Sequence, residues 1–205
     1  MLDHESETIL NQDLGPIALS EEQQQVLLRT ARKAIEQAVT ESGTMIDEVF
    51  DDQLQQPSAV FVTLWQRKQD EPESEGSNHL RGCIGRLQAD FPLYLAVKNA
   101  AISAATRDPR FSPVRPDELD DLTIEIAILT PLETVDKLEE IVIGRDGLVI
   151  EAMGRRGLLL PKVASRMQWD RSEFLRNVCL KAGLPDNTWP ENGQLYRFKT
   201  TVFHE

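Results

Sequence analysis

Residues 122–129 read LTIEIAIL, and this stretch decides the class of fold. Its even-numbered residues are all Leu or Ile, whereas Thr123 and Glu125 occupy odd-numbered positions. Side chains alternate between the two faces of a β-strand, so this period of two predicts a strand with one face in the core. Such alternation is typical of an antiparallel sheet with one buried face.

Three further segments predict strands. Residues 59–67 (AVFVTLWQR) are rich in β-branched and aromatic side chains, and residues 79–87 (HLRGCIGRL) follow an acidic, polar stretch. Residues 195–203 (LYRFKTTVF) show the same pattern near the end of the chain. β-branched and aromatic side chains favour strands, and the polar stretch between the first two segments predicts a hairpin loop.

Helices are predicted on either side of these strands. Ser20 and Gln23 form an S-x-x-Q capping box ahead of apolar residues at helical spacing. Residues 91–106 are apolar and rich in alanine, which predicts a buried helix that begins at Pro92. Strands and helices do not alternate regularly, so the sequence predicts an α+β fold with an antiparallel sheet flanked by helices.

Composition narrows the class of protein. The 205 residues include 34 acidic and 22 basic side chains, a formal charge of −12, so no dense basic field is present to bind nucleic acid non-specifically. No apolar run approaches the roughly 18 residues of a membrane span, and the first residues do not resemble a secretory signal. Two cysteines cannot build a disulfide scaffold. We expect a cytoplasmic protein with reduced thiols that binds neither nucleic acid nor membranes.

Familiar cofactor and metal motifs are absent from the sequence. It contains no phosphate-binding G-x-x-x-x-G-K-[ST], no G-x-G-x-x-G after a strand, no C-x-x-C and no G-x-S-x-G. The three histidines never sit at the spacing of metal ligands. The sequence therefore predicts neither a cofactor nor a metal.

The most unusual stretch is LRGCIGR at 80–86. In a strand, Arg81 and Cys83 would share one face, and a nearby guanidinium would favour the reactive thiolate. Gly82 and Gly85 mark a place where a ligand or another backbone approaches closely. One hypothesis is a substrate-binding stretch with a nucleophilic Cys83 beside an anion-binding Arg81. The other is a small buried cysteine packed beside glycines.

Several other side chains are candidates for the chemistry. His79 would lie about 13 Å along the strand from Cys83, too far for a Cys–His dyad. Glu125 is either a surface glutamate or an acid–base group paired with Arg81 or Arg86. Arg110 would bind an anion or have a structural role, and the sequence leaves both possibilities open.

Several stretches of the sequence occur in an order found in one known family, among them LRGCIG (80–85), DPRF (108–111), IEIAILTPLE (124–133) and GLLLPKVA (157–164). On these stretches the chain resembles the AMMECR domain family, which includes protein A of the AmmeMemoRadiSam gene group. The resemblance covers roughly residues 20–205, and one departure is Lys162, where the family pattern has glutamine.

The resemblance implies two unequal subdomains with the hexapeptide near the groove between them. We expect a loose acidic arm at 1–19, a larger subdomain of 20–132 plus 194–205, and a smaller inserted α+β subdomain at 133–193. The gene group implies a functional association with radical-SAM and Memo-type proteins in a modification pathway. The family itself implies no particular reaction.

Two functional hypotheses follow. The first is an enzyme, or a component of one, that acts on a small anionic or peptide-like substrate in this groove. Arg81 would hold the anion, Cys83 would contact or attack the substrate, Glu125 would orient Arg81 or move a proton, and Arg110 would add positive charge. The second is a non-catalytic module that docks partner proteins through the same groove.

Overall fold

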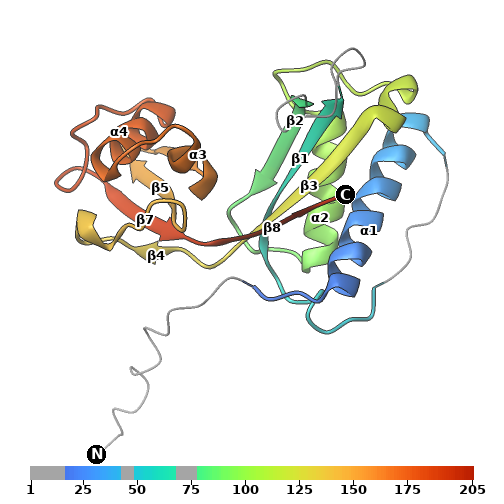
Figure 1. Cartoon of the computed structure of the whole chain (residues 1–205), viewed down its shortest axis with the longest axis horizontal. Coiled ribbons are helices and arrows are strands. Elements are labelled where there is room, and N and C mark those ends of the chain that lie inside the picture. Colours follow the sequence, from blue (N-terminus) through green and yellow to red (C-terminus); the bar gives the residue numbers. More distant parts are fainter. Residues whose placement is uncertain (1–16, 43–48, 68–77) are drawn as a thin grey trace, which may run out of the picture.

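The computed structural model describes residues 17–42, 49–67 and 78–205. The chain forms an α+β structure of two lobes, each built on a four-stranded antiparallel sheet (Figure 1). Most of the predicted acidic arm and of the predicted hairpin loop lies outside the described residues. No helix in the described ranges has the length and apolar character that a membrane crossing requires.

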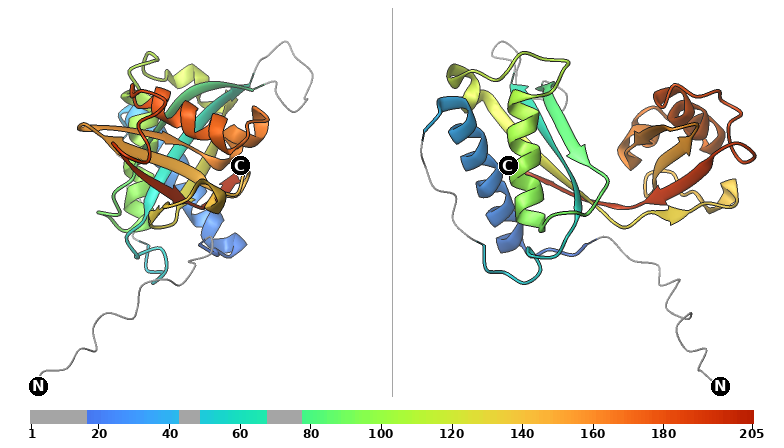
Figure 2. Two further views of the ribbon diagram at one scale, coloured as in Figure 1. Left: turned by 90° about the vertical axis from the view of Figure 1, so that its left-hand side faces the viewer. Right: turned by 180° about the vertical axis from the view of Figure 1, so that it is seen from behind.

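The larger lobe is a sheet covered on one face by two helices. Its strands lie in the order β2-β1-β3-β8. Helices α1 (Glu21–Thr40) and α2 (Leu93–Thr106) pack side by side on the same face, as the view from behind in Figure 2 shows. A short 3-10 helix, η1 (Pro116–Asp121), leads into β3. The strands are β1 (Ala59–Arg67), β2 (Asn78–Arg86), β3 (Leu122–Leu129) and β8 (Thr200–His204).

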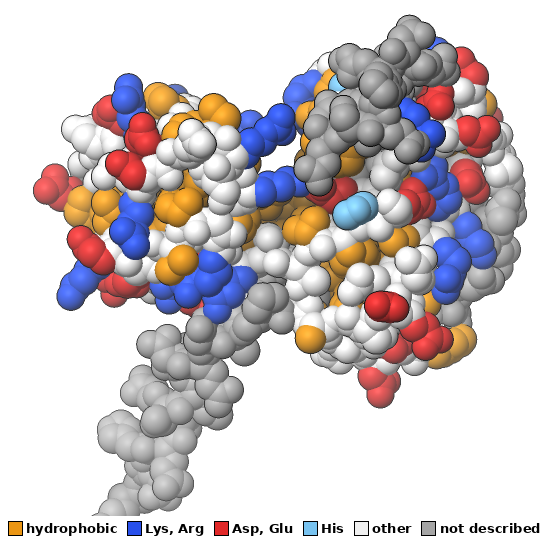
Figure 3. Space-filling view, viewed as in Figure 1, with side chains coloured by type: hydrophobic (Ala, Val, Ile, Leu, Met, Phe, Trp, Pro, Cys, Tyr) orange, Lys and Arg blue, Asp and Glu red, His pale blue; other side chains and the backbone are white. Residues whose placement is uncertain are grey.

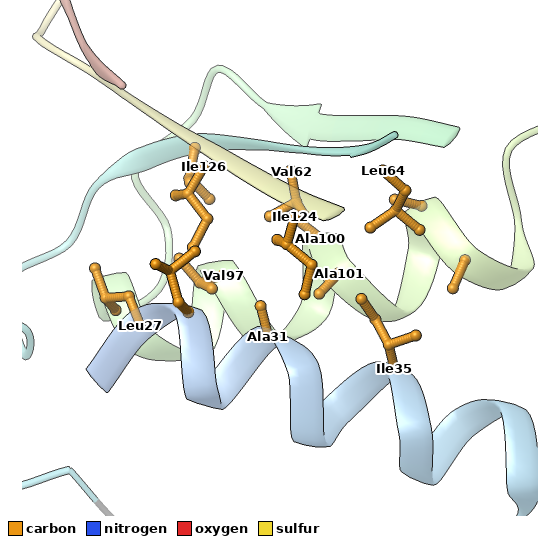
Figure 4. Close-up of a cluster of buried hydrophobic side chains, with 14 of the residues drawn as sticks. Leu27, Ala31, Ile35, Val62, Leu64, Val97, Ala100, Ala101, Ile124 and Ile126 are labelled. Carbon is orange, nitrogen blue, oxygen red and sulfur yellow. The ribbon is translucent and has the colours of Figure 1, made fainter. Parts of the chain in front are cut away.

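The core of this lobe follows from the sequence periodicity. The Ser20 hydroxyl accepts the Gln23 amide and the Gln23 side chain accepts the Ser20 amide, which completes the predicted capping box of α1. Apolar residues at helical spacing on α1 and α2 then meet alternate residues of β1 and β3 (Figure 4). The labelled members of this core are Leu27, Ala31, Ile35, Val62, Leu64, Val97, Ala100, Ala101, Ile124 and Ile126.

The smaller lobe pairs its strands in the order β4-β7-β5-β6. A Pro at the start of α3 and an Asp170 cap at the start of α4 fix where these helices begin, and Phe174 and Val178 of α4 pack into a second core. Its elements are β4 (Glu133–Thr134), η2 (Leu138–Glu140), β5 (Gly147–Ala152), β6 (Arg155–Leu159), α3 (Pro161–Arg166), α4 (Arg171–Lys181) and β7 (Gln194–Phe198).

The predicted single strand at 195–203 is in fact two strands in two sheets. Residues 194–198 form β7 of the smaller lobe, not part of the larger subdomain as predicted, and β8 then joins the larger sheet. Lys199 lies between them and exchanges two hydrogen bonds with Thr130: the Thr130 amide donates to the Lys199 carbonyl (3.0 Å), and the Lys199 amide donates to Thr130 Oγ1 (2.9 Å). The strand pattern is continuous because both halves pair, so periodicity alone does not reveal the crossing.

A third apolar cluster joins the lobes. Ala59, Phe61 and Leu129 of the larger lobe pack with Val149 and Phe198 of the smaller one. The contact buries apolar surface at one end of the interface, which favours a defined arrangement of the lobes.

Candidate functional site

Four chemically active side chains lie in a row across the larger sheet. Cys83 on β2 pairs with Thr63 on β1, Thr63 pairs with Glu125 on β3, and Glu125 pairs with His204 on β8. Directly paired residues of an antiparallel ladder project from the same face. The neighbouring residues Val62 and Ile124 project into the helix-covered core, so this polar row (Cys83, Thr63, Glu125 and His204) lies on the opposite face.

The polar row faces the smaller lobe. Lys162, from the first turn of α3, forms an ion pair with Glu125, and its Nζ lies 5.8 Å from the centre of the Trp65 ring. Figure 3 shows the hollow between the lobes, with basic side chains reaching across it. Because Lys162 is the partner of Glu125, the prediction that Arg81 or Arg86 pairs with it is wrong. We refer to this hollow, between the polar row and α3, as the inter-lobe groove.

Cys83 is the more accessible of the two thiols. It is half-buried, and the Thr63 hydroxyl donates a hydrogen bond to its sulfur at 3.3 Å. Cys179 is fully buried in the core of the smaller lobe, and this burial raises the pKa of its thiol. A reagent or substrate in the groove therefore meets Cys83 first.

The loop after α2 clamps the backbone of Cys83. The Cys83 amide donates to Asp108 Oδ2 (2.8 Å), and Arg110 donates to both oxygens of the same carboxylate (2.9 and 2.7 Å). The Arg110 hydrogen bonds, with a smaller effect from the Cys83 amide, hold the pKa of Asp108 well below its usual range against the opposing effect of burial. Asp108 is almost fully buried, whereas half of the Arg110 side chain is exposed. We call this arrangement the Asp108 clamp; it places an exposed guanidinium close to the thiol.

Arg81 lies elsewhere than predicted. It is buried, and its guanidinium donates to both oxygens of Glu118 (2.9 and 3.1 Å) and to the carbonyls of Ser112 and Pro113. The pairing of β1 and β2 shifts by one residue here, so Arg81 has no cross-strand partner and leaves the regular alternation. The structure therefore gives Arg81 an internal ion pair in place of the predicted anion site, and this pair lowers the pKa of Glu118.

Both glycines of the hexapeptide are explained by packing. A Cβ on Gly82 would lie 2.2 Å from the Ala104 carbonyl oxygen of α2, and one on Gly85 would lie 2.3 Å from Cγ of Phe61. The close approach that the glycines indicate is therefore made by neighbouring parts of this chain. In the structure they allow α2 and Phe61 to pack against β2.

The site contains residues that sequence reasoning missed. Thr63 and Trp65 lie on β1 and Lys162 lies on α3, and only the strand register and the position of α3 bring them to Glu125 and Cys83. His204 does reach the polar row, but three strand spacings, roughly 14 Å, separate it from Cys83. Within the described residues, no group of three or more His, Cys, Asp or Glu side chains could hold a metal ion.

Comparison with known proteins identifies the family. The AMMECR1 family model matches residues 28–203. A protein of Methanothermobacter thermautotrophicus is 43% identical over 91% of this chain and 96% of its own length, and protein MJ0810 of Methanocaldococcus jannaschii is 43% identical over 87% and 88%. The crystal structure of the uncharacterized protein PH0010 from Pyrococcus horikoshii superimposes with a TM-score of 0.77 at 40% identity, covering 87% of this chain and 89% of that one. This chain therefore belongs to the AMMECR1 family.

Proposed function

We propose that the protein is an enzyme, or an enzyme component of a modification pathway, that binds a small anionic or peptide-like substrate in the inter-lobe groove. In this proposal the Cys83 thiol contacts the substrate and Arg110 supplies the positive charge predicted for Arg81. The observation that carries the proposal is the pairing of a half-buried thiol with a half-exposed guanidinium held by one carboxylate.

The Asp108 clamp supports this assignment because it fixes the reactive group through its own backbone. The Cys83 amide and the Arg110 guanidinium share Asp108, and Arg110 also donates to the Cys83 carbonyl, so the positive charge is held beside the backbone that carries the sulfur. A positioned cation beside a nucleophile lowers the cost of binding an anionic group there. Thr63 adds a hydroxyl on the same face, within reach of the sulfur.

The proposal is tested by the rate of thiol alkylation in the full chain at neutral pH. With iodoacetate as an anionic reagent and iodoacetamide as a neutral one, we expect Cys83 to react at least tenfold faster than Cys179. Arg110→Gln should slow the alkylation of Cys83 by iodoacetate more than its alkylation by iodoacetamide, because the substitution removes the charge that attracts the anion. Arg166→Gln removes an exposed charge from α3 and serves as the matched control.

Two results would contradict the proposal. One is a Cys83 rate no greater than that of Cys179 in the folded chain. The other is an equal decrease in the rates of Cys83 alkylation by iodoacetate and by iodoacetamide in Arg110→Gln. That result would indicate a structural effect of the substitution without anion attraction. Capture of metabolites by the intact chain, repeated with Cys83→Ser, then identifies the substrate class.

The ion pair of Glu125 favours a second candidate, a non-catalytic docking module. Glu125 is ion-paired with Lys162, and His204 lies three strand spacings, roughly 14 Å, from Cys83, so neither Glu125 nor His204 is placed to take a proton from Cys83. In that case partner proteins, including the proposed radical-SAM and Memo-type associates, would dock in the same groove. Pull-down of purified partners would separate the two candidates: a docking module loses partners in Arg110→Gln but keeps them in Cys83→Ser.

A further inference from the structure

A second cavity lies on the other side of β2 from the Cys83 side chain. It encloses about 350 Å3 between the outer edge of β2 and helix α2, which contact each other at the edge of the larger sheet (Figure 2, view from behind). Its apolar wall includes Val60, Ile84 and Ala100, and its rim carries polar side chains. Pockets that combine an apolar wall with a few convergent polar groups are the usual form of binding sites.

The backbone of β2 is unpaired where it meets this cavity. β2 is an edge strand, and at Cys83 its outward-facing amide and carbonyl are covered by Asp108 and Arg110. Outward orientation recurs every second residue in an antiparallel ladder, so the amide and carbonyl of Gly85 point the same way. Gly85 lines the cavity, and neither group has a hydrogen-bond partner among the described residues.

The charge of the rim is positive. Arg86 and Arg107 line the cavity, and no acidic side chain does. Arg86 is engaged with Asp90, whereas Arg107 is exposed and has no side-chain partner in the part of the chain that the structure describes. Asn99 and Ser103 of α2 face the same space. The cavity therefore offers an unpaired strand edge, neutral polar groups and one available guanidinium.

We propose that this cavity binds an extended peptide that adds to the edge of β2 and places a carboxylate on Arg107. A free amide and carbonyl on a strand edge are complementary to another peptide backbone, and the apolar wall would take one or two small side chains. This edge site is separate from the inter-lobe groove, because the Cys83 side chain projects from the opposite face.

The packing of α2 places Arg107 relative to the edge of β2. Gly82 lies against Ala104, near the end of α2, whereas the chain before α2 hydrogen-bonds near the other end of β2, through the Ser58 amide and the Phe91 carbonyl. Arg107 thus lies toward the Cys83 end of the cavity. A peptide antiparallel to β2 would bring its carboxyl end to this position, so the preferred carboxylate is the C-terminal one.

The test uses a defined pool of acetylated hexapeptides, randomised over all residues except cysteine, with a free C-terminus. The pool is passed over the immobilised full chain, and a bound peptide identified by mass spectrometry is resynthesised. In the 15N-labelled protein this peptide should shift the Gly85 amide resonance. Its C-terminal amide and Arg107→Gln should each weaken binding at least tenfold, whereas Arg166→Gln should change it by less than twofold.

Two further arms address the backbone and the pocket. N-methylation of the peptide residue that pairs with Gly85 should abolish binding, and Ser103→Leu, which fills the cavity, should do the same while circular dichroism stays unchanged. The proposal is overturned if the pool yields no binder at millimolar concentration, if the binder shifts resonances away from Gly85, or if sodium acetate competes as well as the peptide. Cys83→Ser should not affect binding, so failure here is distinguishable from failure of the groove proposal.

Discussion

Asp108 connects the Cys83 amide with the Arg110 guanidinium, two groups whose residues are 27 positions apart in the sequence. Its carboxylate accepts hydrogen bonds from the Cys83 amide and from Arg110 while it is almost fully buried. A short carboxylate in this position can accept hydrogen bonds from the backbone of an edge strand and from a guanidinium at the same time. Cys83 is therefore fixed by a neighbouring loop as well as by its own strand.

Asp108→Asn should destabilise the chain by about 1–3 kcal/mol, because charged hydrogen bonds are replaced by weaker neutral ones at a buried position. Urea unfolding monitored by circular dichroism measures the change. Asp117→Asn is the control, since Asp117 pairs with Arg115 on an exposed surface and its loss should change little. Equal effects of the two substitutions would show that the clamp adds no stability.

Acid should destabilise the chain through the same residues. The pKa values of Asp108 and Glu118 are lowered in the folded chain by their arginine partners, whereas unfolded Asp and Glu titrate near about 4. The unfolded chain then takes up protons first on acidification, so the free energy of unfolding falls as the pH drops below about 4. Urea midpoints between pH 7 and 3 should show this fall, with a shallower slope in Asp108→Asn; an unchanged slope would contradict the assignment.

Arg81 and Glu118 form the second residue-scale test. Arg81→Leu leaves a buried carboxylate without its cation, which should cost about 3–5 kcal/mol. The double variant Arg81→Leu with Glu118→Leu should recover most of that stability, because replacing a whole buried ion pair with apolar groups is often nearly neutral. A double variant as unstable as the single one would show that Arg81 acts through its carbonyl contacts with Ser112 and Pro113.

At the scale of elements, the contact of α2 with β2 depends on a missing side chain. A Cβ on Gly82 would lie far inside van der Waals distance of the Ala104 carbonyl, and backbone cannot move aside cheaply. Gly82→Ala should therefore destabilise the chain by about 1–3 kcal/mol or more, measured by urea unfolding. The contact is with the backbone of Ala104, so no change of side chain on α2 can relieve it. A stable Gly82→Ala protein would mean that α2 can shift away from the strand.

Elements were more predictable than their register. The period-two pattern of 122–129 and the alanine-rich 91–106 stretch identified a strand and a helix that the structure contains as β3 and α2. Patterns of this kind do not encode the one-residue shift at Arg81 or the crossing at Lys199. The shift and the crossing leave the local composition of their strands unchanged. The prediction that Arg81 and Cys83 share one face assumes a regular strand. The one-residue shift makes that assumption invalid.

Side chains from distant elements were the least predictable part of the site. Cys83, Glu125 and Arg110 were identified from residue type alone, which says where chemistry is possible. Their partners Thr63 and Lys162 depend on strand order and on how α3 meets the sheet. Such contacts are tertiary and leave no periodic signal in one sequence.

For the molecule as a whole, Lys162 links two lobes that an apolar cluster and two chain crossings also join. Lys162→Gln should leave the free energy of unfolding within about 1 kcal/mol, since half of the Lys162 side chain is exposed. It should raise the alkylation rate of Cys83 several-fold by removing one restraint across the groove. Lys181→Gln, on the exposed end of α4, is the control. An unchanged rate would show that the apolar cluster alone sets access to the thiol.

The crossing at Thr130 and Lys199 also constrains the order in which the chain can assemble. β3 is made before the smaller lobe and β8 after it, yet the two strands pair in one sheet. During synthesis on a ribosome, β3 must therefore wait with an open edge until the intervening lobe has emerged. A long-range pairing of this kind slows folding and exposes strand edges to other chains in the meantime. This topology therefore makes the nascent chain prone to aggregate even when the native protein is stable.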